Sequence, residues 1–484
     1  MNAVARRGAC PALSAPMMTG DGLLVRLNPT ASELPPKTLI GLCKSALRHG
    51  NGIVEITARG SFQIRGLTPQ SAALLAEDVN ALGIAVRTGV PVETGPLAGL
   101  DLDEIADPRP VADAIRKATG TAGLSARLGP KASVVVDGGG HSGLDEVLAD
   151  VLLTAVQGGE HSVWRLATGG NAKTAQFVGD FAEMAAVEAT ISILQAIAAL
   201  GVEARAKHLG NIERLHSALP PSVLTDISLT RGEIAPAALL SPIANIAGKM
   251  AAPKLPISPL RGEMSGRTKG GPKEHDAGSV GDLLPLHDAR VALPLALPFG
   301  SMEASALISF IETAEKIGAT EIRLAPRRTL LLLTSSAEAA EAIRTIAGNY
   351  GLLTSSTDPR LHIAACSGAP ACASGKLATR DVAMETAQDA VALLDGSVTV
   401  HVSGCAKGCA HPGPAGLAIV GGENGAGLVV NGTAGHTPLA YTRPDGLPAA
   451  LARLARERAA GETAAACLTR LGPAKVAAFF EGRV

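Results

Sequence analysis

The sequence contains one structural pattern twice. Residues 52–67 (GIVEITARGSFQIRGL) and 318–333 (GATEIRLAPRRTLLLL) each resemble two strands joined by a kink, and the first run of each alternates apolar and polar residues. Each is followed by an apolar-periodic run, Ser71–Leu82 and Glu338–Ala347. Alternation with period two predicts strands, and the longer period predicts helices. Two copies of a strand–strand–helix unit favour an architecture in which the halves are related by an approximate two-fold axis.

A second pair of similar segments follows the first. Lys131–Gly140 (KASVVVDGGG) and Gly396–Gly404 (GSVTVHVSG) each look like a β-branched strand that ends in a glycine turn. Farther along, Trp164–Gly170 and Leu417–Gly422 are apolar runs that end in paired glycines, and we interpret them as corresponding strands. Strands mixed with helices, without strict strand–helix alternation, predict the α+β class.

A segment rich in proline and glycine separates the two halves. Residues 253–282 contain four prolines and six glycines among Ser, Lys and Arg residues, which is typical of a flexible linker or insertion. We therefore expect five consecutive parts. They are half-domain A (1–95), α/β domain B without cysteine ligands (96–250), the linker (251–284), half-domain A′ (285–355) and domain B′ with the cysteine cluster (356–484).

Four of the seven cysteines lie close together in domain B′. They form a C-x5-C pair and a C-x3-C pair separated by 32 residues, at Cys366, Cys372, Cys405 and Cys409. In an otherwise cysteine-poor intracellular chain, clustered thiols bind a metal or cluster more often than they form disulfides. The spacing differs from the C-x2-C pairs of zinc ribbons and suits a [4Fe–4S] cluster held by four thiolates.

The glycines around the second pair support a cluster. Gly404, Gly408 and Gly413 allow the backbone to wrap closely, so that amide hydrogens can point at cluster sulfurs. A zinc site and four buried structural cysteines are the alternatives. The other three cysteines are isolated and are expected to be ordinary thiols: Cys10, Cys43 and Cys467.

Arginines recur on the polar faces of the predicted strands. The set comprises Arg26, Arg59, Arg65, Arg323, Arg327 and Arg328. Guanidinium groups bind carboxylates in a bidentate manner, so several of them in one cleft would suit a polyanionic ligand. The alternative is a solvated sheet face. The repeat symmetry favours the binding interpretation for Arg59, Arg65 and Arg327.

Composition excludes several classes of partner. A net charge of −1 gives no electrostatic basis for binding nucleic acid or an anionic membrane, and 2% aromatic residues leave few platforms for stacking bases.

The apolar run Met184–Leu200 predicts an amphipathic helix rather than a membrane span. Arg6 and Arg7 are followed by no unbroken apolar stretch, so we expect a cytoplasmic protein. No NAD or FAD fingerprint is present, which indicates that electrons come from a separate protein.

These features together resemble the sulfite and nitrite reductase superfamily, whose members place a [4Fe–4S] cluster against a sirohaem. The resemblance rests on the cysteine pattern, the duplicated halves and the segment RGSFQIRG, and it spans nearly the whole chain outside the linker. Within the superfamily, four segments are similar to the precorrin-3B synthase family of aerobic cobalamin biosynthesis. They are RRGACPALSAPMMTGDGLLVRLNP, LGPKASVVVDGGG, CSGAPACASGKLATRD and SGCAKGCAHP.

The resemblance implies a fold, a substrate and a reaction. The fold would have two ferredoxin-like half-domains and two α/β domains with pseudo-two-fold symmetry. Precorrin-3A, a tetrapyrrole with many carboxylates, would occupy the cleft that holds sirohaem in the reductases. Its carboxylates would be bound by Arg26, Arg59, Gln63, Arg65, Lys131 and Arg327. Dioxygen would hydroxylate C20, and a γ-lactone would form from the ring A acetate.

The resemblance also implies cofactors and an electron donor. The cluster on the four cysteines would pass electrons from an external donor, either an NADH-linked reductase or a ferredoxin or flavodoxin. The family is also expected to use a mononuclear non-haem iron, whose ligands the sequence does not identify. No catalytic acid or base is assigned.

Two departures from the reductases matter. Sirohaem reductases typically have GCPNGC where this chain has GCAKGC, and they carry two lysines two residues apart where this chain has Lys131 and Ser133. Fewer cations fit poorly with the heavy proton demand of sulfite reduction and are compatible with a monooxygenase. A sirohaem-dependent nitrite or sulfite reductase is the alternative. A non-catalytic iron–sulfur electron carrier is a further one, but such a carrier needs no polyanion cleft.

Overall fold

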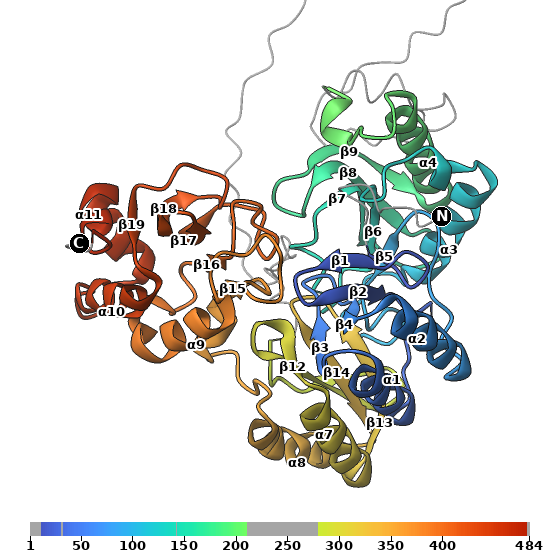
Figure 1. Ribbon diagram of the computed structural model, residues 1–484. Helices are drawn as coiled ribbons and strands as arrows, with labels where there is room; N and C mark the ends of the chain where they lie inside the picture. The colour runs from blue at the N-terminus through green and yellow to red at the C-terminus, as the bar shows by residue number, and fades with distance from the viewer. Residues whose placement is uncertain (1–10, 31, 142, 211–278, 482–484) are drawn as a thin grey trace, which may run out of the picture.

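The computed structural model describes residues 11–30, 32–141, 143–210 and 279–481. These residues form four β-sheets, each with helices packed against it (Figure 1). Figure 1 shows half-domains A (blue) and A′ (yellow) packed together, with domain B (green) and domain B′ (orange to red) on different sides of them. Cys10, the Arg6–Arg7 pair and most of the predicted linker lie outside the described residues.

Half-domain A is a sheet covered on one side by two helices. Its elements are β1 (Met17–Thr19), β2 (Gly22–Leu27), α1 (Pro36–His49), β3 (Ile53–Ile56), β4 (Phe62–Leu67) and α2 (Pro69–Ala81). The strand order is β1-β2-β4-β3, with all neighbours antiparallel. A reciprocal capping box between Thr68 and Ser71 starts α2, close to where the apolar period predicted a helix.

Half-domain A′ repeats this plan. Its elements are β10 (Leu284–Pro285), β11 (Val291–Ala296), β12 (Ser301–Glu303), α7 (Ala304–Ile317), β13 (Ala319–Ala325), β14 (Thr329–Thr334) and α8 (Ala337–Ala347). The order β11-β14-β13 matches β2-β4-β3 in half-domain A. The predicted duplication is therefore present in the fold.

The two half-domains are joined by exchanged edge segments and a common core. β12 of half-domain A′ pairs with β3, so that Met302 lies opposite Val54. Reciprocally, Leu34 of half-domain A bridges to Ile322 on β13, with hydrogen bonds of 3.0 and 2.9 Å. One continuous hydrophobic cluster includes α1, α2, α7 and α8 together with both sheets. The pair is therefore a single folding unit rather than two.

Domains B and B′ share a second topology. Domain B consists of β5 (Val92–Thr94), α3 (Arg109–Thr121), β6 (Val134–Asp137), β7 (Ala149–Gln157), β8 (Val163–Gly170), β9 (Gln176–Ala182) and α4 (Glu183–Ala199). Domain B′ consists of β15 (Ile363–Ala365), α9 (Thr379–Asp389), β16 (Val400–Ser403), β17 (Ala415–Gly422), β18 (Gly425–Gly432), β19 (Ala440–Thr442), α10 (Leu447–Arg456) and α11 (Ala464–Ala478). In each sheet the first three strands are parallel and the next two pairings are antiparallel.

This topology corrects three sequence-based assignments. The glycine-ended runs in β8 and β17 are not counterparts, because β17 corresponds to β7 and β8 to β18. The boundary at 95/96 is misplaced, because β5 pairs with β6 and therefore belongs to domain B. The predicted linker (251–284) ends one residue too late, because Leu284 begins β10, which pairs with β11.

The α/β domains cover the half-domain sheets crosswise. On half-domain A′, Arg323 is buried and donates to the carbonyl of Pro96 in domain B at 2.7 Å. On half-domain A, the amide of Gly20 donates to the carbonyl of Ala371 in domain B′ at 3.2 Å. Each half-domain therefore packs against the α/β domain from the other half of the chain.

The separate cores predict separable unfolding. Phe310 on α7 is fully buried in the common core, whereas Trp164, the single tryptophan, is fully buried in the core of domain B. We expect Phe310→Ala to lower the stability of the A–A′ unit by about 3–5 kcal/mol because it leaves a cavity. The far-UV circular dichroism transition in urea should move, while the Trp164 fluorescence transition stays in place.

A matched control is Leu74→Ala on the exposed side of α2, which should move neither transition. Equal shifts of both signals with Phe310→Ala would show that domain B unfolds together with the A–A′ unit.

Candidate functional site

The two cysteine pairs follow neighbouring parallel strands. Cys366 comes directly after β15, and Cys405 comes two residues after β16. β15 and β16 are paired in parallel, with Ala365 opposite Val402. The carboxyl ends of parallel strands meet at one edge of a sheet, so both cysteine loops start from the same edge. The structure thus explains how pairs 32 residues apart can act together.

Close backbone contacts hold the two loops against each other. The Gly404 amide donates to Sγ of Cys366 at 3.2 Å, and the Lys376 amide donates to the carbonyl of Gly404 at 2.8 Å. A Cβ on Gly404 would lie 3.1 Å from Cα of Gly375 and 3.2 Å from Cα of Gly368. A side chain at 404 would therefore be tight against the first loop, and the Gly404 amide points at the sulfur of Cys366.

The other three thiols of the two pairs lie close enough to Cys409 to affect its pKa. All four are free cysteines. Partial burial raises the pKa of the Cys409 thiol, and the neighbouring thiols Cys405, Cys366 and Cys372 raise it further, whereas Lys407 lowers it. Among the described residues, no three His, Cys, Asp or Glu side chains are arranged to hold a single metal ion. A four-iron cluster is bound by four separate thiolates, and four free thiols with an amide donor fit such a group.

A polar face on half-domain A lies next to the first cysteine loop. Arg26, Gln63 and Glu55 are directly opposite one another across β2, β4 and β3. Nε and Nη2 of Arg26 donate to Oε1 of Gln63 at 2.9 and 2.7 Å, and Nε2 of Gln63 donates to Glu55 at 2.7 Å. Alternation along the strands thus puts the predicted polar residues on one face, and the structure links three of them in a chain of hydrogen bonds.

Arg65 occupies a different environment from the one predicted. It is 3% exposed, and it donates to both carboxylate oxygens of Asp21 at 3.1 Å. It also donates to Oγ of Ser367 at 3.1 Å and to the carbonyl of Ala371, both in the C-x5-C loop. Glu55 lies 3.7 Å from its guanidinium. Its fork is therefore occupied by protein groups.

The surroundings of Arg65 keep it charged. Burial by itself would lower its pKa, but the hydrogen bonds to Asp21 and the charges of Glu55, Asp21 and Cys372 outweigh burial and raise the pKa. Glu55 is also buried and accepts from Arg380 at the start of α9. The sequence analysis did not single out Arg380, although its place at the start of a helix, directly after the C-x5-C loop, could have marked it as a contact of that loop.

Arg59 lies on the turn between β3 and β4 and reaches domain B. Its Nη1 is 3.5 Å from Oγ of Ser133, and its Nη2 donates to the carbonyl of Leu148. Ser133 is the position where the reductases carry a second lysine, and here it meets a guanidinium. Lys131, two residues earlier, is exposed. Arg59 thus contacts domain B two residues away from Lys131 in the sequence.

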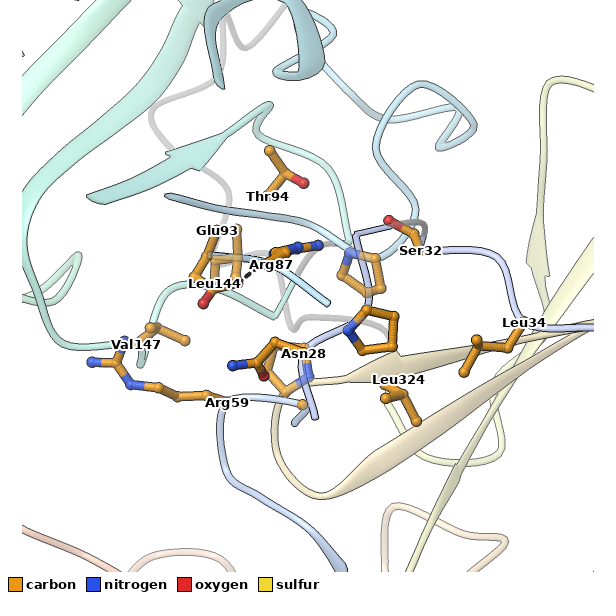
Figure 2. A pocket seen from close by; sticks show the side chains of 14 residues that line it. Asn28, Ser32, Leu34, Arg59, Arg87, Glu93, Thr94, Leu144, Val147 and Leu324 are labelled. Atoms are coloured by element: carbon orange, nitrogen blue, oxygen red, sulfur yellow. Dashed lines mark hydrogen bonds and ion pairs between the residues drawn. The ribbon is translucent and has the colours of Figure 1, made fainter. Parts of the chain in front are cut away.

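Arg59 also lines a small pocket between half-domains A and A′ and domain B. Figure 2 shows Arg59 near Val147 at one side and the Arg87–Glu93 pair, 3.0 Å apart, at the other. Asn28 lies between them (Figure 2). Polar groups of both charges therefore line the junction of the three parts.

Arg327 lies on the equivalent turn of half-domain A′. It is exposed and lies 3.4 Å from Asp145 and 3.3 Å from Glu146 of domain B. Its amide donates to the carbonyl of Ala58 at 3.0 Å, so the two turns touch. The next residue, Arg328, donates to the carbonyl of Ala410 in the second cysteine segment at 3.1 Å. The structure thus places Arg328 closer to the cysteine loops than Arg327.

His401 is a buried histidine beneath the second cysteine loop. It is fully buried on β16, and neither ring nitrogen has a hydrogen-bond partner among the described residues. Burial lowers its pKa to about 4, with smaller contributions from His411 and Arg328, so the ring is neutral at physiological pH. The His411 ring lies 5.8 Å away. Sequence reasoning assigned no role to either histidine.

None of the helices in the described part of the chain is long and apolar enough to cross a membrane.

Comparisons with known proteins agree with this architecture. Residues 15–82 match the family described as nitrite/sulfite reductase ferredoxin-like half domain. The solved structure of Mycobacterium tuberculosis NirA superimposes with a TM-score of 0.67 at 19% identity, covering 94% of this chain and 84% of that one. This likeness establishes the fold, the duplicated sulfite and nitrite reductase architecture.

Sequence relatives identify the branch of the superfamily. The sulfite reductase [NADPH] hemoprotein beta-component of Xylella fastidiosa (strain M23) is 27% identical over 146 residues, 28% of this chain and 26% of that protein. Precorrin-3B synthase of Sinorhizobium sp is 40% identical over 480 residues, 98% of this chain and 95% of that protein. The chain therefore belongs to the precorrin-3B synthase family.

Proposed function

We propose that this chain is an iron–sulfur monooxygenase that converts precorrin-3A to precorrin-3B in aerobic cobalamin biosynthesis. It would hydroxylate C20 and form a γ-lactone with the ring A acetate. The observation that carries the proposal is the meeting of two cysteine loops at one sheet edge, directly beside the arginine-bearing face of half-domain A. Full-length similarity to a relative named precorrin-3B synthase supports it.

The cysteine ligands would be Cys366, Cys372, Cys405 and Cys409. A [4Fe–4S] cluster bound there would supply electrons from an external donor one at a time. Hydroxylation by dioxygen places one oxygen atom in the substrate and reduces the other to water, which consumes two electrons and two protons. The exposure of Cys409 puts one corner of the site within reach of a separate donor protein, such as a ferredoxin, a flavodoxin or an NADH-linked reductase.

The cationic groups would bind and orient the tetrapyrrole carboxylates. Arg59 and Arg327 sit on adjoining turns, and Arg26 and Gln63 extend the polar surface along the sheet. Lys131 is exposed in domain B, two residues before Ser133, which Arg59 contacts. Planar guanidinium forks hold carboxylates in a fixed direction, which would set the position of C20. Arg65 was predicted in this set, but Asp21, Ser367 and the carbonyl of Ala371 occupy its guanidinium.

The present contacts of Arg59 and Arg327 are compatible with carboxylate binding. Arg327 pairs with the exposed carboxylates of Asp145 and Glu146, and such pairs are weak in water. A propionate can therefore replace them at low cost. A mononuclear non-haem iron remains part of the proposal without assigned ligands.

The first experiment is an anaerobic purification with an optical spectrum and pigment extraction, followed by addition of precorrin-3A, a reductant and oxygen. We expect a brown cluster spectrum without sirohaem bands and oxygen-dependent formation of precorrin-3B. Stoichiometric sirohaem with turnover of nitrite or sulfite would overturn the proposal in favour of a sirohaem reductase. Binding of neither pigment would favour an electron carrier.

Cysteine substitutions test the ligand set. Cys405→Ser and Cys409→Ser should each lose most of the bound iron, because a four-thiolate site lacks one ligand. Iron and sulfide assays with visible spectroscopy measure this. Cys467→Ala, at a buried and isolated thiol on α11, is the matched control and should keep the cluster. An intact cluster in both serine variants would refute the ligand assignment.

Arg59→Ala tests the carboxylate-binding surface. Loss of a charge-assisted contact should weaken precorrin-3A binding roughly 10- to 100-fold while the cluster spectrum stays unchanged. Anaerobic binding titrations measure the affinity. The control is Arg48→Ala, an arginine that is 61% exposed and pairs with Asp78 on the helical side of half-domain A. Equal affinities for Arg59→Ala and wild type would assign Arg59 to domain packing alone.

A further inference from the structure

We propose that Arg65 is a positioning residue for the iron–sulfur site rather than a ligand of the substrate. It would fix the C-x5-C loop on half-domain A and keep a positive charge beside Cys372. The inference rests on the proposed function for the presence of the cluster, but it concerns a residue of half-domain A, outside the domain that carries the four cysteines.

The first argument is the set of partners. Arg65 donates to Asp21 at 3.1 Å through two nitrogens, to Ser367 at 3.1 Å and to the carbonyl of Ala371. Ser367 follows the first cysteine of the pair, and Ala371 precedes the second. One guanidinium therefore holds both ends of the segment between Cys366 and Cys372.

The second argument is that the attachment is reinforced around Arg65. The amide of Gly20 donates to the same Ala371 carbonyl at 3.2 Å. A Cβ on Gly20 would lie 2.5 Å from the carbonyl oxygen of Pro370, so the β1–β2 turn must carry glycine for the loop to approach. Arg380, just beyond the loop, contacts Glu55. The loop is thus tied to the sheet of half-domain A at several points.

The third argument is electrostatic. Arg65 and Glu55 are 3% and 5% exposed, so their charges are poorly screened by solvent. Arg65 offsets the carboxylates of Asp21 and Glu55, so its removal would leave net negative charge beside the cluster and disfavour the reduced, more negative state. Buried groups that orient metal ligands typically change metal affinity or activity by about 10- to 100-fold when removed.

The consequence for substrate binding is the opposite of the sequence-based prediction. A carboxylate of the tetrapyrrole could bind Arg65 only by displacing Asp21 or the loop itself. Arg59 instead reaches Ser133 and the carbonyl of Leu148 in domain B. The two arginines of the segment RGSFQIR therefore serve different ligands.

The experiment compares Arg65→Met and Arg65→Lys after anaerobic cluster reconstitution. Methionine removes the charge and the fork, whereas lysine keeps the charge and loses the fork. We expect Arg65→Met to show a more negative midpoint potential and an altered EPR spectrum. Loss of iron to a chelator should be roughly tenfold faster than in wild type. Arg65→Lys should keep a near-wild-type potential but also lose iron faster.

The control is Arg165→Met in domain B. Arg165 makes the same two-nitrogen contact with a carboxylate, Asp180, at 2.9 Å, but it lies in the domain without the cysteines. Its cluster potential and iron retention should match wild type. If Arg65→Met does not fold, Asp21→Asn loosens the same fork and should shift iron retention in the same direction.

Two outcomes would overturn the inference. One is a wild-type potential, EPR spectrum and iron retention in Arg65→Met and Asp21→Asn. The other is an unchanged cluster together with a roughly tenfold weaker affinity for precorrin-3A, as expected for a carboxylate contact. A wild-type protein that holds the cluster but does not convert precorrin-3A would overturn the proposed function and leave the role of Arg65 standing.

Discussion

The arrangement of this molecule depends on the joining of half-domains A and A′ through one core and two exchanged edge segments. This joint brings the turn of Arg59 against the turn of Arg327, where the Arg327 amide donates to Ala58 at 3.0 Å. Gly60 is required there, because its φ is +78° and a Cβ would lie 2.8 Å from the carbonyl carbon of Ala325. From this fixed point, one turn reaches domain B and the other reaches both B and B′.

Charged groups at the junction with domain B′ are buried, as Arg65 and Glu55 are, or half-buried, as Asp21 and Arg380 are. Two carboxylates, Asp21 and Glu55, face two guanidinium groups, Arg65 and Arg380, so the set is neutral as a whole. Burying such a set costs desolvation energy, and apolar residues often stabilise an interface as well or better. What the set provides is direction, since Asp21 orients the Arg65 guanidinium, which then contacts the C-x5-C loop at Ser367 and Ala371. The contacts that Arg59 and Arg327 make with domain B are more exposed to solvent, so a ligand carboxylate can replace them more easily.

Periodicity was sufficient to predict β3, β4 and α2 and their counterparts β13, β14 and α8, because Val54 and Ile64 face the core while Glu55 and Gln63 face away from it. The spacing of the cysteines predicted two separate loops, and the parallel pairing of β15 with β16 starts both loops from one sheet edge. The partner of each polar side chain was not predictable. Arg59 and Arg65 look equivalent along the chain, but Arg65 meets residues about 300 positions away, which no local pattern encodes. The strand β7 was overlooked as a repeat unit although the paired glycines Gly158 and Gly159 directly follow it.

The exchange of edge segments has a consequence for the origin of the chain. A single half, cut at the linker, would leave β3 or β13 without its edge partner and would expose the polar face that the opposite α/β domain covers. Unpaired strand edges invite association with another chain. A single copy of the unit would satisfy both strand edges by pairing with a second copy in a symmetric homodimer. In the single chain the two α/β domains are free to differ, and domain B′ carries the paired cysteines while domain B has none.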